Sequence, residues 1–455
     1  MAAEERAGAA GMGAKEGVVD TRLMPSRVHW GAPAAQALPR VLARLGCRRA
    51  VLLVSRSLRT GTGAIDEIAR ALGDSCAAIW DGMPAHTPRE AVLDAAAVAR
   101  AANADVIVTI GGGSLTDGAK VVRIALAIGA TTPQELGRYA GAEGPKRARE
   151  GGKGASRRLS LIPQVVIPTT LSAGEFAPWA GCTDSETRTK EAYLFSEALP
   201  VAVIFDPALA CRTPEKTFLG TGVRAVDHCV EALCSHDGNP YSDNLAAGAL
   251  TLLVRGLRRV KVVPTDLEAR SACQLGIFQA AQASHSGPHM GASHAIGRAT
   301  LPLQQTPFAS PLPTMRGGHI LGPLFDVPHG ETSCVALPGV LRWNAQTGAG
   351  QLERQCLVVR AFAAAGAAPL AASASASAAE CVAELVRDLG LPGSLAAVGV
   401  QRGALEEAAR RTMQDPLVEF NPRRINDWRD VLEILELCGP FASERGDQVA
   451  ERSKL

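Results

Sequence analysis

A glycine-rich turn between two apolar stretches is the segment with the clearest chemistry. Residues 106–110 are apolar apart from one threonine, and Gly111-Gly112-Gly113-Ser114 follow them directly. Glycine allows positive φ and lets a ligand approach the main chain, while the first N–H groups of the next helix point at an anion. Asp117 and Lys120, three residues apart on that expected helix, should share one face. The pattern predicts a cradle for nucleotide phosphates; the alternative is a tight turn without a ligand.

Three histidines in the second half of the chain are candidates for metal binding or proton transfer. His228, His294 and His329 lie in separate segments, far apart in the sequence. Histidines that converge from separate helices can bind a divalent metal or act as acids and bases. Each one alone is more often an ordinary core or surface histidine. The residues by themselves leave both interpretations open.

Composition restricts the class of protein. A length of 455 residues is enough for two or three domains. The hydrophobic content of 47% is enough for a large core. The net charge of +2 gives no field that favours nucleic acid or an anionic membrane. Residues 141–158 are basic and glycine-rich without aromatic residues, which predicts a surface loop. No run reaches the ~18 apolar residues of a spanning helix. We therefore expect a cytoplasmic protein with a small-molecule substrate.

The elements that position the candidate residues alternate in the first half of the chain. Short apolar runs alternate with helical spacing, which is typical of a parallel sheet covered by helices. The runs are residues 50–55, 77–81, 106–110, 164–168 and 201–205. Long helical patterns dominate after residue 207. The expected organisation is a disordered tail at 1–22, an α/β domain at 23–208 and a helical domain at 209–455.

Five ordered motifs resemble those of the iron-containing alcohol dehydrogenases. They are GGGSLTDGAK at 111–120, PTTLSAGEF at 168–176, GVRAVDHCVEAL at 222–233, GASHAIG at 291–297 and VPHGETSCVALP at 327–338. Within that family the chain most resembles the maleylacetate reductases, through Asn421-Pro422-Arg423. The resemblance implies an N-terminal dinucleotide-binding domain of the dehydroquinate-synthase type with a parallel sheet, an all-α C-terminal domain, an active site between them, and a homodimer.

Site residues follow from the resemblance by position. It implies that the cofactor pyrophosphate is bound by Gly111, Gly112, Gly113, Ser114 and Asp117. It implies that the ribose and nicotinamide are lined by Thr169, Thr170 and Ser172. Three of the family's four metal ligands, for Fe or Zn, are matched by His228, His294 and His329.

The choice between NAD and NADP depends on the residues after the first strand of the nucleotide-binding fold. An acidic residue there usually binds the ribose hydroxyls of NAD, whereas a basic one can bind the extra phosphate of NADP. Ser55 and Arg56 occupy this place, and no acidic residue is present. The pattern favours NADP, with the alternative that Arg56 is a solvated loop residue.

The chain departs from the family at the fourth metal ligand. Members that use iron or zinc have an aspartate four residues before the histidine that His228 matches, and here that position is Arg224. A guanidinium cannot lose its proton, so it cannot coordinate a metal. We expect metal-independent reduction of a small acidic enone or carbonyl compound, in which Arg224 anchors or polarises an oxygen. The alternative is an Arg224 ion pair with Asp227 or Glu231 and a metal-dependent alcohol dehydrogenase that uses three histidines.

A second departure follows His294. Family members continue directly into another histidine, which here is His319, after an insertion at 298–318 that contains four prolines. Prolines at that density cannot lie inside a helix. The insertion is a lid, an error such as a retained intron, or a change that leaves a pseudoenzyme. If His319 lies beside His294, it is the best candidate for the proton donor. The candidate catalytic residues are therefore His294, His319, Arg224 and His228.

Overall fold

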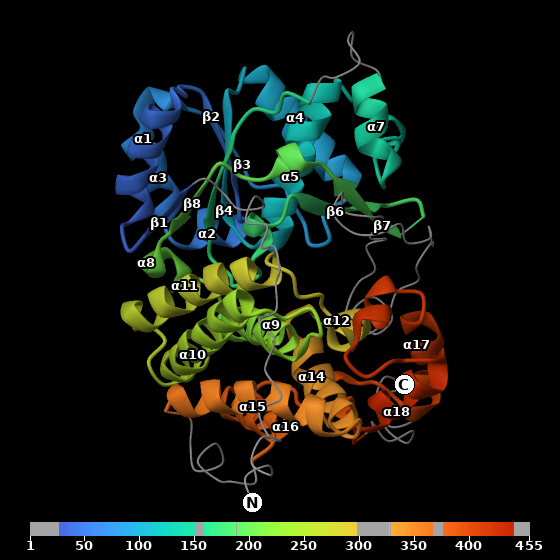
Figure 1. Cartoon of the computed structure of the whole chain (residues 1–455). Helices are drawn as coiled ribbons and strands as arrows, with labels where there is room; N and C mark the ends of the chain where they lie inside the picture. The colour runs from blue at the N-terminus through green and yellow to red at the C-terminus, as the bar shows by residue number, and fades with distance from the viewer. Residues whose placement is uncertain are drawn as a thin grey trace, which may run out of the picture.

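The computed structural model describes residues 27–150, 159–187, 189–297, 327, 329–366 and 376–440. The tail expected at 1–22, the insertion at 298–318 and His319 lie outside the described residues, and the side chain of His329 is also outside them. The chain otherwise divides into an α/β half and a helical half, which are stacked on each other in Figure 1.

A six-stranded parallel sheet organises the first half, with the strand order β1-β8-β5-β4-β2-β3. Its strands are β1 (Arg27–Trp30), β2 (Ala50–Val54), β3 (Cys76–Trp80), β4 (Val106–Gly111), β5 (Gln164–Pro168) and β8 (Ala202–Phe205). The central strands β2, β4 and β5 are buried along their whole length, as expected for a sheet covered on both faces. The parallel α/β fold predicted from the alternating pattern is confirmed.

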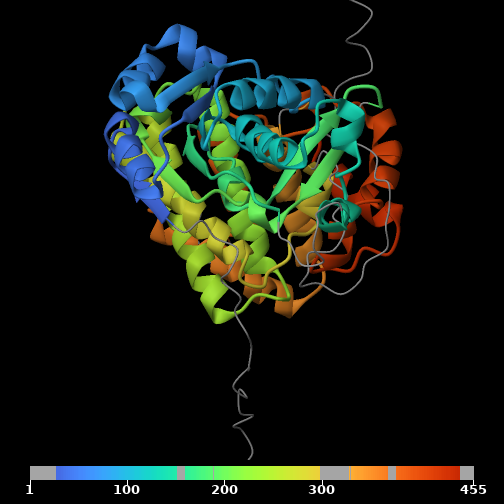
Figure 2. The ribbon, with the colours of Figure 1, turned by 90° about the horizontal axis from the view of Figure 1, so that it is seen from above.

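Successive residues of the central strands point to opposite faces of the sheet. Leu52 and Val108 pack with α1 (Ala34–Leu45) and α3 (Ala64–Leu72) on one face. Leu53 and Ile107 pack with α4 (Arg89–Ala101) and α5 (Gly113–Ile128) on the other. The blue and the cyan helices on the two sides of the strands are visible in Figure 1 and Figure 2. Two short helices, α2 (Arg56–Gly61) and α6 (Pro133–Gly137), complete this part.

Two elements of the first half differ from the sequence expectation. Residues 141–158 were expected to form a loop, but 143–150 form helix α7 (Glu143–Glu150), and residues 151–158 lie outside the description. Glu143 and Lys146 pair at 2.8 Å across one turn, a spacing that supports a helix despite the glycines nearby. An antiparallel hairpin of β6 (Trp179–Asp184) and β7 (Thr189–Leu194) was not predicted at all.

Helices make up the second half. They are α8 (Pro207–Ala210), α9 (Glu215–Cys234), α10 (Pro240–Val262), α11 (Leu267–Ser284), α12 (Ala292–Gly297), α14 (His329–Ala345), α15 (Ala349–Ala364), α16 (Ala378–Asp388), α17 (Leu405–Thr412) and α18 (Trp428–Glu436). Within the described residues, no helix combines the length and the apolar character needed to span a membrane.

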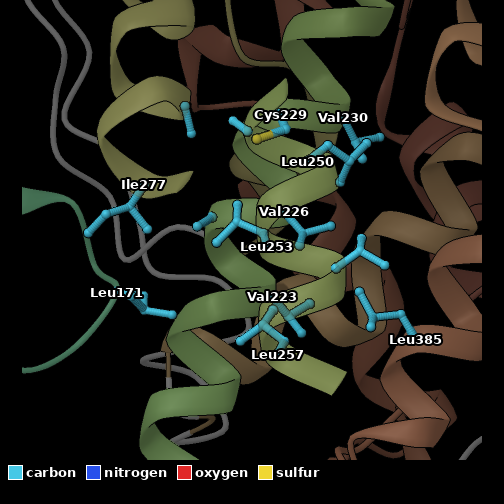
Figure 3. Packing of buried hydrophobic residues seen from close by; sticks show 14 of the residues in the cluster. Leu171, Val223, Val226, Cys229, Val230, Leu250, Leu253, Leu257, Ile277 and Leu385 are labelled. Atoms are coloured by element: carbon cyan, nitrogen blue, oxygen red, sulfur yellow. The ribbon is translucent and has the colours of Figure 1, made fainter. Parts of the chain in front are cut away.

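Helix α9 lies at the centre of this half. Val223, Val226 and Val230 of α9 are fully buried in the main core cluster, with leucines of α10 around them (Figure 3). Leu171, from the loop after β5, joins the same cluster. Its N–H donates to Thr221 Oγ1 of α9 at 3.0 Å. The loop after β5 therefore connects the sheet to the helix that carries Arg224 and His228.

Candidate active site

The glycine turn begins at the end of β4, where Gly111 has φ of +155°. This backbone conformation is one that side chains rarely allow. A Cβ on Gly111 would lie 3.2 Å from Ser55 Cβ, so glycine also lets the carboxyl end of β2 approach. The Ser55 N–H donates to the Ile110 carbonyl at 3.0 Å and fixes this contact. Two of the predicted cofactor segments thus meet at the carboxyl edge of the sheet, where open α/β sheets bind ligands.

The loop after β5 closes on the other side of the same turn. A Cβ on Gly112 would lie 3.3 Å from Thr170 Cγ2, and one on Gly113 would lie 3.1 Å from Ser172 Cβ. The Thr170 and Ser172 hydroxyls hydrogen-bond each other at 2.8 Å. The absence of side chains at Gly112 and Gly113 therefore lets the loop after β5 pack closely against the turn, with two hydroxyl groups beside it.

Thr169 has a different place from its neighbour Thr170. Its side chain is buried, its N–H donates to the Gly111 carbonyl at 3.0 Å, and its carbonyl accepts the Thr213 hydroxyl at 2.7 Å. It joins the glycine turn to the start of the helical half through its backbone. Thr169 therefore stabilises the glycine turn through backbone hydrogen bonds.

Asp117 and Lys120 lie close together, as their spacing predicted, with Lys120 Nζ 3.2 Å from Asp117 Oδ1. Asp117 Oδ2 accepts the Gly181 N–H at 3.2 Å, so both carboxylate oxygens have protein partners. Lys120 also donates to the carbonyls of Gly174 and Trp179, at 2.6 and 2.9 Å. Burial lowers the pKa of Lys120. The buried Lys120 side chain therefore connects α5 to the loop after β5. Ser114, on the first turn of α5, is exposed.

At the end of β2, Ser55 is the N-cap of α2 and Arg56 is its first residue. The Ser55 and Ser57 hydroxyls are 2.9 Å apart. Arg56 is exposed beside the edge of the sheet that carries the glycine turn. Its position is compatible with a phosphate group on the adenosine side of a nucleotide.

His228 and His294 lie together, with ring centroids 4.5 Å apart in an edge-to-face arrangement. His228 Nδ1 donates to the carbonyl of Arg224, one turn earlier on α9, at 2.9 Å. Because a carbonyl only accepts, this bond places a proton on Nδ1. Burial, and then the neighbouring His294, hold the pKa of His228 well below its usual range. The His228 imidazole is therefore neutral at neutral pH.

Arg224 forms an ion pair within the protein. Its Nη1 lies 3.4 Å from Asp227 Oδ2 and donates to Ser333 Oγ at 3.0 Å. Asp227 Oδ2 also accepts the hydroxyls of Ser333, at 2.6 Å, and Ser293, at 3.0 Å. Burial and the neighbouring Glu231 raise the pKa of Asp227 to about 7, although Arg224 lowers it. The ion pair considered as an alternative for Arg224 is thus present, and its partner is Asp227.

Among the described residues, the donor atoms of Asp227, Glu231 and His294 lie within 4.8 Å of one another, a spacing at which three ligands could hold a metal. Their contacts do not suit this role. Glu231 Oε2 and His294 Nδ1 are only 2.6 Å apart and hydrogen-bond each other. The Arg224 guanidinium faces Asp227, and its charge opposes a nearby divalent cation. Burial raises the pKa of Glu231 to about 7, whereas the N–H groups of Gly291 and Ser293 lower it. These residues do not fit a metal ion.

Sequence reasoning missed three residues around the histidines as site candidates. Glu231 lies one turn after His228 on α9, a spacing that indicates a shared helix face. His285 follows α11 and packs edge-to-face with Trp179 of the α/β half, at 5.8 Å between centroids. Asn421 was noted only as part of a motif, and its Oδ1 accepts the Ala292 N–H at 3.2 Å. No local pattern connected Asn421 with His294.

Two family descriptions match most of the chain. Iron-containing alcohol dehydrogenase matches residues 25–207. Fe-containing alcohol dehydrogenase family, C-terminal, matches residues 218–302 and 317–438. Residues 303–316, inside the expected insertion, fall between the two C-terminal blocks.

Several known proteins are similar over nearly their whole length. Dehydrogenase ALT3 of Alternaria alternata is 32% identical over 416 residues, covering 86% of this chain and 98% of the relative. A maleylacetate reductase of Sphingobium indicum is 28% identical over 404 residues, covering 89% and 93%. The crystal structure of maleylacetate reductase from Agrobacterium tumefaciens superposes with a TM-score of 0.67 at 26% identity, covering 93% of this chain and 97% of that one.

Proposed function

We propose a specific activity for this chain, which belongs to the iron-containing alcohol dehydrogenase family. It is a metal-independent NAD(P)H-dependent reductase. Its substrate would be a small acidic enone or carbonyl compound, as the name maleylacetate reductase suggests for its relatives. The observation that carries the proposal is Arg224, which stands at the aspartate position of the metal-using members and is buried against Asp227. A positive charge thus occupies the neighbourhood in which those members bind a cation.

The glycine turn fits a dinucleotide. Gly111, Gly112 and Gly113 would hold the pyrophosphate, with Ser114 on the first turn of α5. Thr170 and Ser172 lie beside the turn and would line the ribose and nicotinamide. When bound, the reduced nicotinamide supplies a hydride. The cofactor is NADPH in this proposal, because the end of β2 offers Arg56 and no acidic residue.

Reduction of a carbonyl or an enone by hydride also requires a proton. His294 and His228 lie together beside the Arg224–Asp227 pair, and both are held through Nδ1. A histidine would donate the proton, while the Arg224 charge would stabilise negative charge developing on the substrate oxygen. His319, outside the described residues, stays a candidate for the same donor role.

A metal-dependent alcohol dehydrogenase is the second candidate function. The contact between His228 and His294 favours it, because these residues match metal ligands of the family. A pseudoenzyme that binds the cofactor without turnover is the third, favoured by the unmatched block at 303–316.

The test measures NADPH and NADH oxidation against keto acids, enoic acids such as maleylacetate, and neutral aldehydes, with and without chelator. Activity on acidic substrates that survives chelation supports the proposal. Activity on neutral aldehydes that requires added iron or zinc would establish the second function, and cofactor binding without oxidation would establish the third. Light scattering on the same preparation tests the homodimer.

A further inference from the structure

Helix α12, which carries His294, is only six residues long, and the chain that follows it lies outside the described residues. A helix this short leaves most of its backbone N–H groups without partners inside the helix. Its position, and that of the His294 ring, must therefore come from tertiary contacts.

One carboxylate supplies most of these contacts. Glu231 Oε1 accepts the Ser293 N–H at 2.9 Å, and Oε2 accepts the Gly291 N–H at 3.0 Å. Oε2 also accepts Nδ1–H of His294 at 2.6 Å. Glu231 extends from α9, so a single buried side chain fixes both the backbone of the turn and the orientation of the ring.

Asn421 holds the same turn through a second contact. Its Oδ1 accepts the Ala292 N–H at 3.2 Å, and its Nδ2 donates to Asn344 Oδ1 of α14 at 2.8 Å. A Cβ on Gly291 would lie 3.1 Å from Asn421 Oδ1 and 3.4 Å from Glu231 Oε1. The turn thus contacts two polar side chains at close range, and glycine at position 291 allows both contacts. The contact with Asn421 gives the Asn-Pro-Arg motif a place in the active site.

We propose that Glu231 is the positioning residue of His294. It accepts Nδ1–H, so that Nε2 carries the proton that the imidazolium gives to the substrate oxygen, and the ring is left neutral as the Nδ1–H tautomer. The inference rests on the proposed reductase function for its catalytic part. The orientation of a catalytic histidine by a carboxylate at its other nitrogen is a general device. Asp227 is less suited to the task, because its Oδ2 is 3.5 Å from His294 Nδ1 and is already used by Arg224.

The variant Glu231→Gln tests the proposal. The glutamine side chain keeps one oxygen that can accept from the α12 backbone. Its NH₂ group is a donor, so it can no longer accept Nδ1–H of His294 there. We expect kcat to fall about 10²-fold, the lower range for a lost acid–base group. The Kd for NADPH, measured by fluorescence, should stay unchanged. Glu231→Asp, which keeps a carboxylate at shorter reach, should recover part of the loss.

The control is Glu433→Gln, which makes the same change in the α18 carboxylate that accepts Trp343 Nε1 at 3.0 Å, away from the histidines. It should retain wild-type kcat. Equal kcat in Glu231→Gln and wild type, or equal losses in Glu231→Gln and Glu231→Asp, would contradict the positioning role.

A second readout needs no activity. In protein labelled with ¹⁵N-histidine and free of ligand, the His294 resonance, assigned with His294→Asn, should report Nδ1–H in wild type and a shift of the proton toward Nε2 in Glu231→Gln. An unchanged tautomer overturns the inference. If no substrate is reduced but the tautomer changes, the positioning by Glu231 stands and the proposed function fails.

Discussion

The guanidinium of Arg224 and the carboxylate of Asp227 lie 3.4 Å apart, three residues along the same helix and both buried. The family resemblance implies an aspartate at the position of Arg224 in members that use a metal. The chain carries a positive group there, and Asp227 balances its charge. The hydroxyls of Ser293 and Ser333 both donate to Oδ2 of Asp227.

Removal of one member of this ion pair should destabilise the protein. Arg224→Met leaves the Asp227 carboxylate buried without its cation, which costs about 3–5 kcal/mol in comparable pairs. Arg224→Met/Asp227→Asn removes both charges and should recover most of the loss. Urea unfolding of the two variants and of Asp227→Asn gives the coupling. A wild-type free energy of unfolding for Arg224→Met would show that the pair does not stabilise the fold.

A side chain in the glycine turn should weaken cofactor binding. Gly111→Ala meets both a positive φ and the Ser55 side chain, so the Kd for NADPH should rise by more than about tenfold, equivalent to 1.4 kcal/mol. Gly350→Ala is the matched control, because a Cβ there meets nothing within 4 Å. Fluorescence titration measures both. Unchanged affinity in Gly111→Ala would place the pyrophosphate elsewhere.

Arg56 should determine the preference for the phosphorylated cofactor. Arg56→Ala removes the exposed cation at the end of β2 and should lower kcat/KM for NADPH about tenfold while that for NADH changes little. Steady-state kinetics with both cofactors at equal ionic strength measure the ratio. If kcat/KM changed equally for NADH and NADPH, Arg56 would be a solvated loop residue without a role in cofactor choice.

Glu175 should make stability depend on pH. Burial raises its pKa to about 7, Lys120 lowers it and Asp117 raises it. The folded protein therefore holds this proton to higher pH than the unfolded chain, and the associated stability is lost as pH rises from about 4.5 through 7. Glu175→Gln cannot ionise, so it should exceed wild type by up to about 3 kcal/mol at pH ~8.5 and match it near pH ~4.5. A difference independent of pH would exclude ionisation of Glu175 as the cause.

The sequence predicted those parts of the fold that depend on local patterns. The apolar run ending at Gly111 indicated a buried parallel strand, and the spacing of Asp117 and Lys120 indicated their contact. The β6–β7 hairpin was missed because polar residues such as Asp184 and Lys190 interrupt its alternation. Its strands are positioned by contacts with α5 and with Thr87, which are distant in the sequence.

The contacts between side chains at the histidines could be predicted only in part. Helical spacing brought Asp227 and Glu231 into consideration as partners of Arg224, but it could not choose between them. The choice depends on Ser333 and Ser293, which α14 and α12 bring to Asp227 from more than 60 residues away. The link from Asn421 to α12 spans 129 residues and has no local signal.

In the proposed function, the charge of Arg224 takes the place of a metal ion. The most direct measurement is NADPH oxidation with maleylacetate by protein whose iron and zinc content has been determined by mass spectrometry, before and after treatment with chelator. We expect substoichiometric metal and the same kcat in both samples. One iron or zinc per chain, with activity that disappears on chelation and returns on addition of that metal, would contradict this expectation.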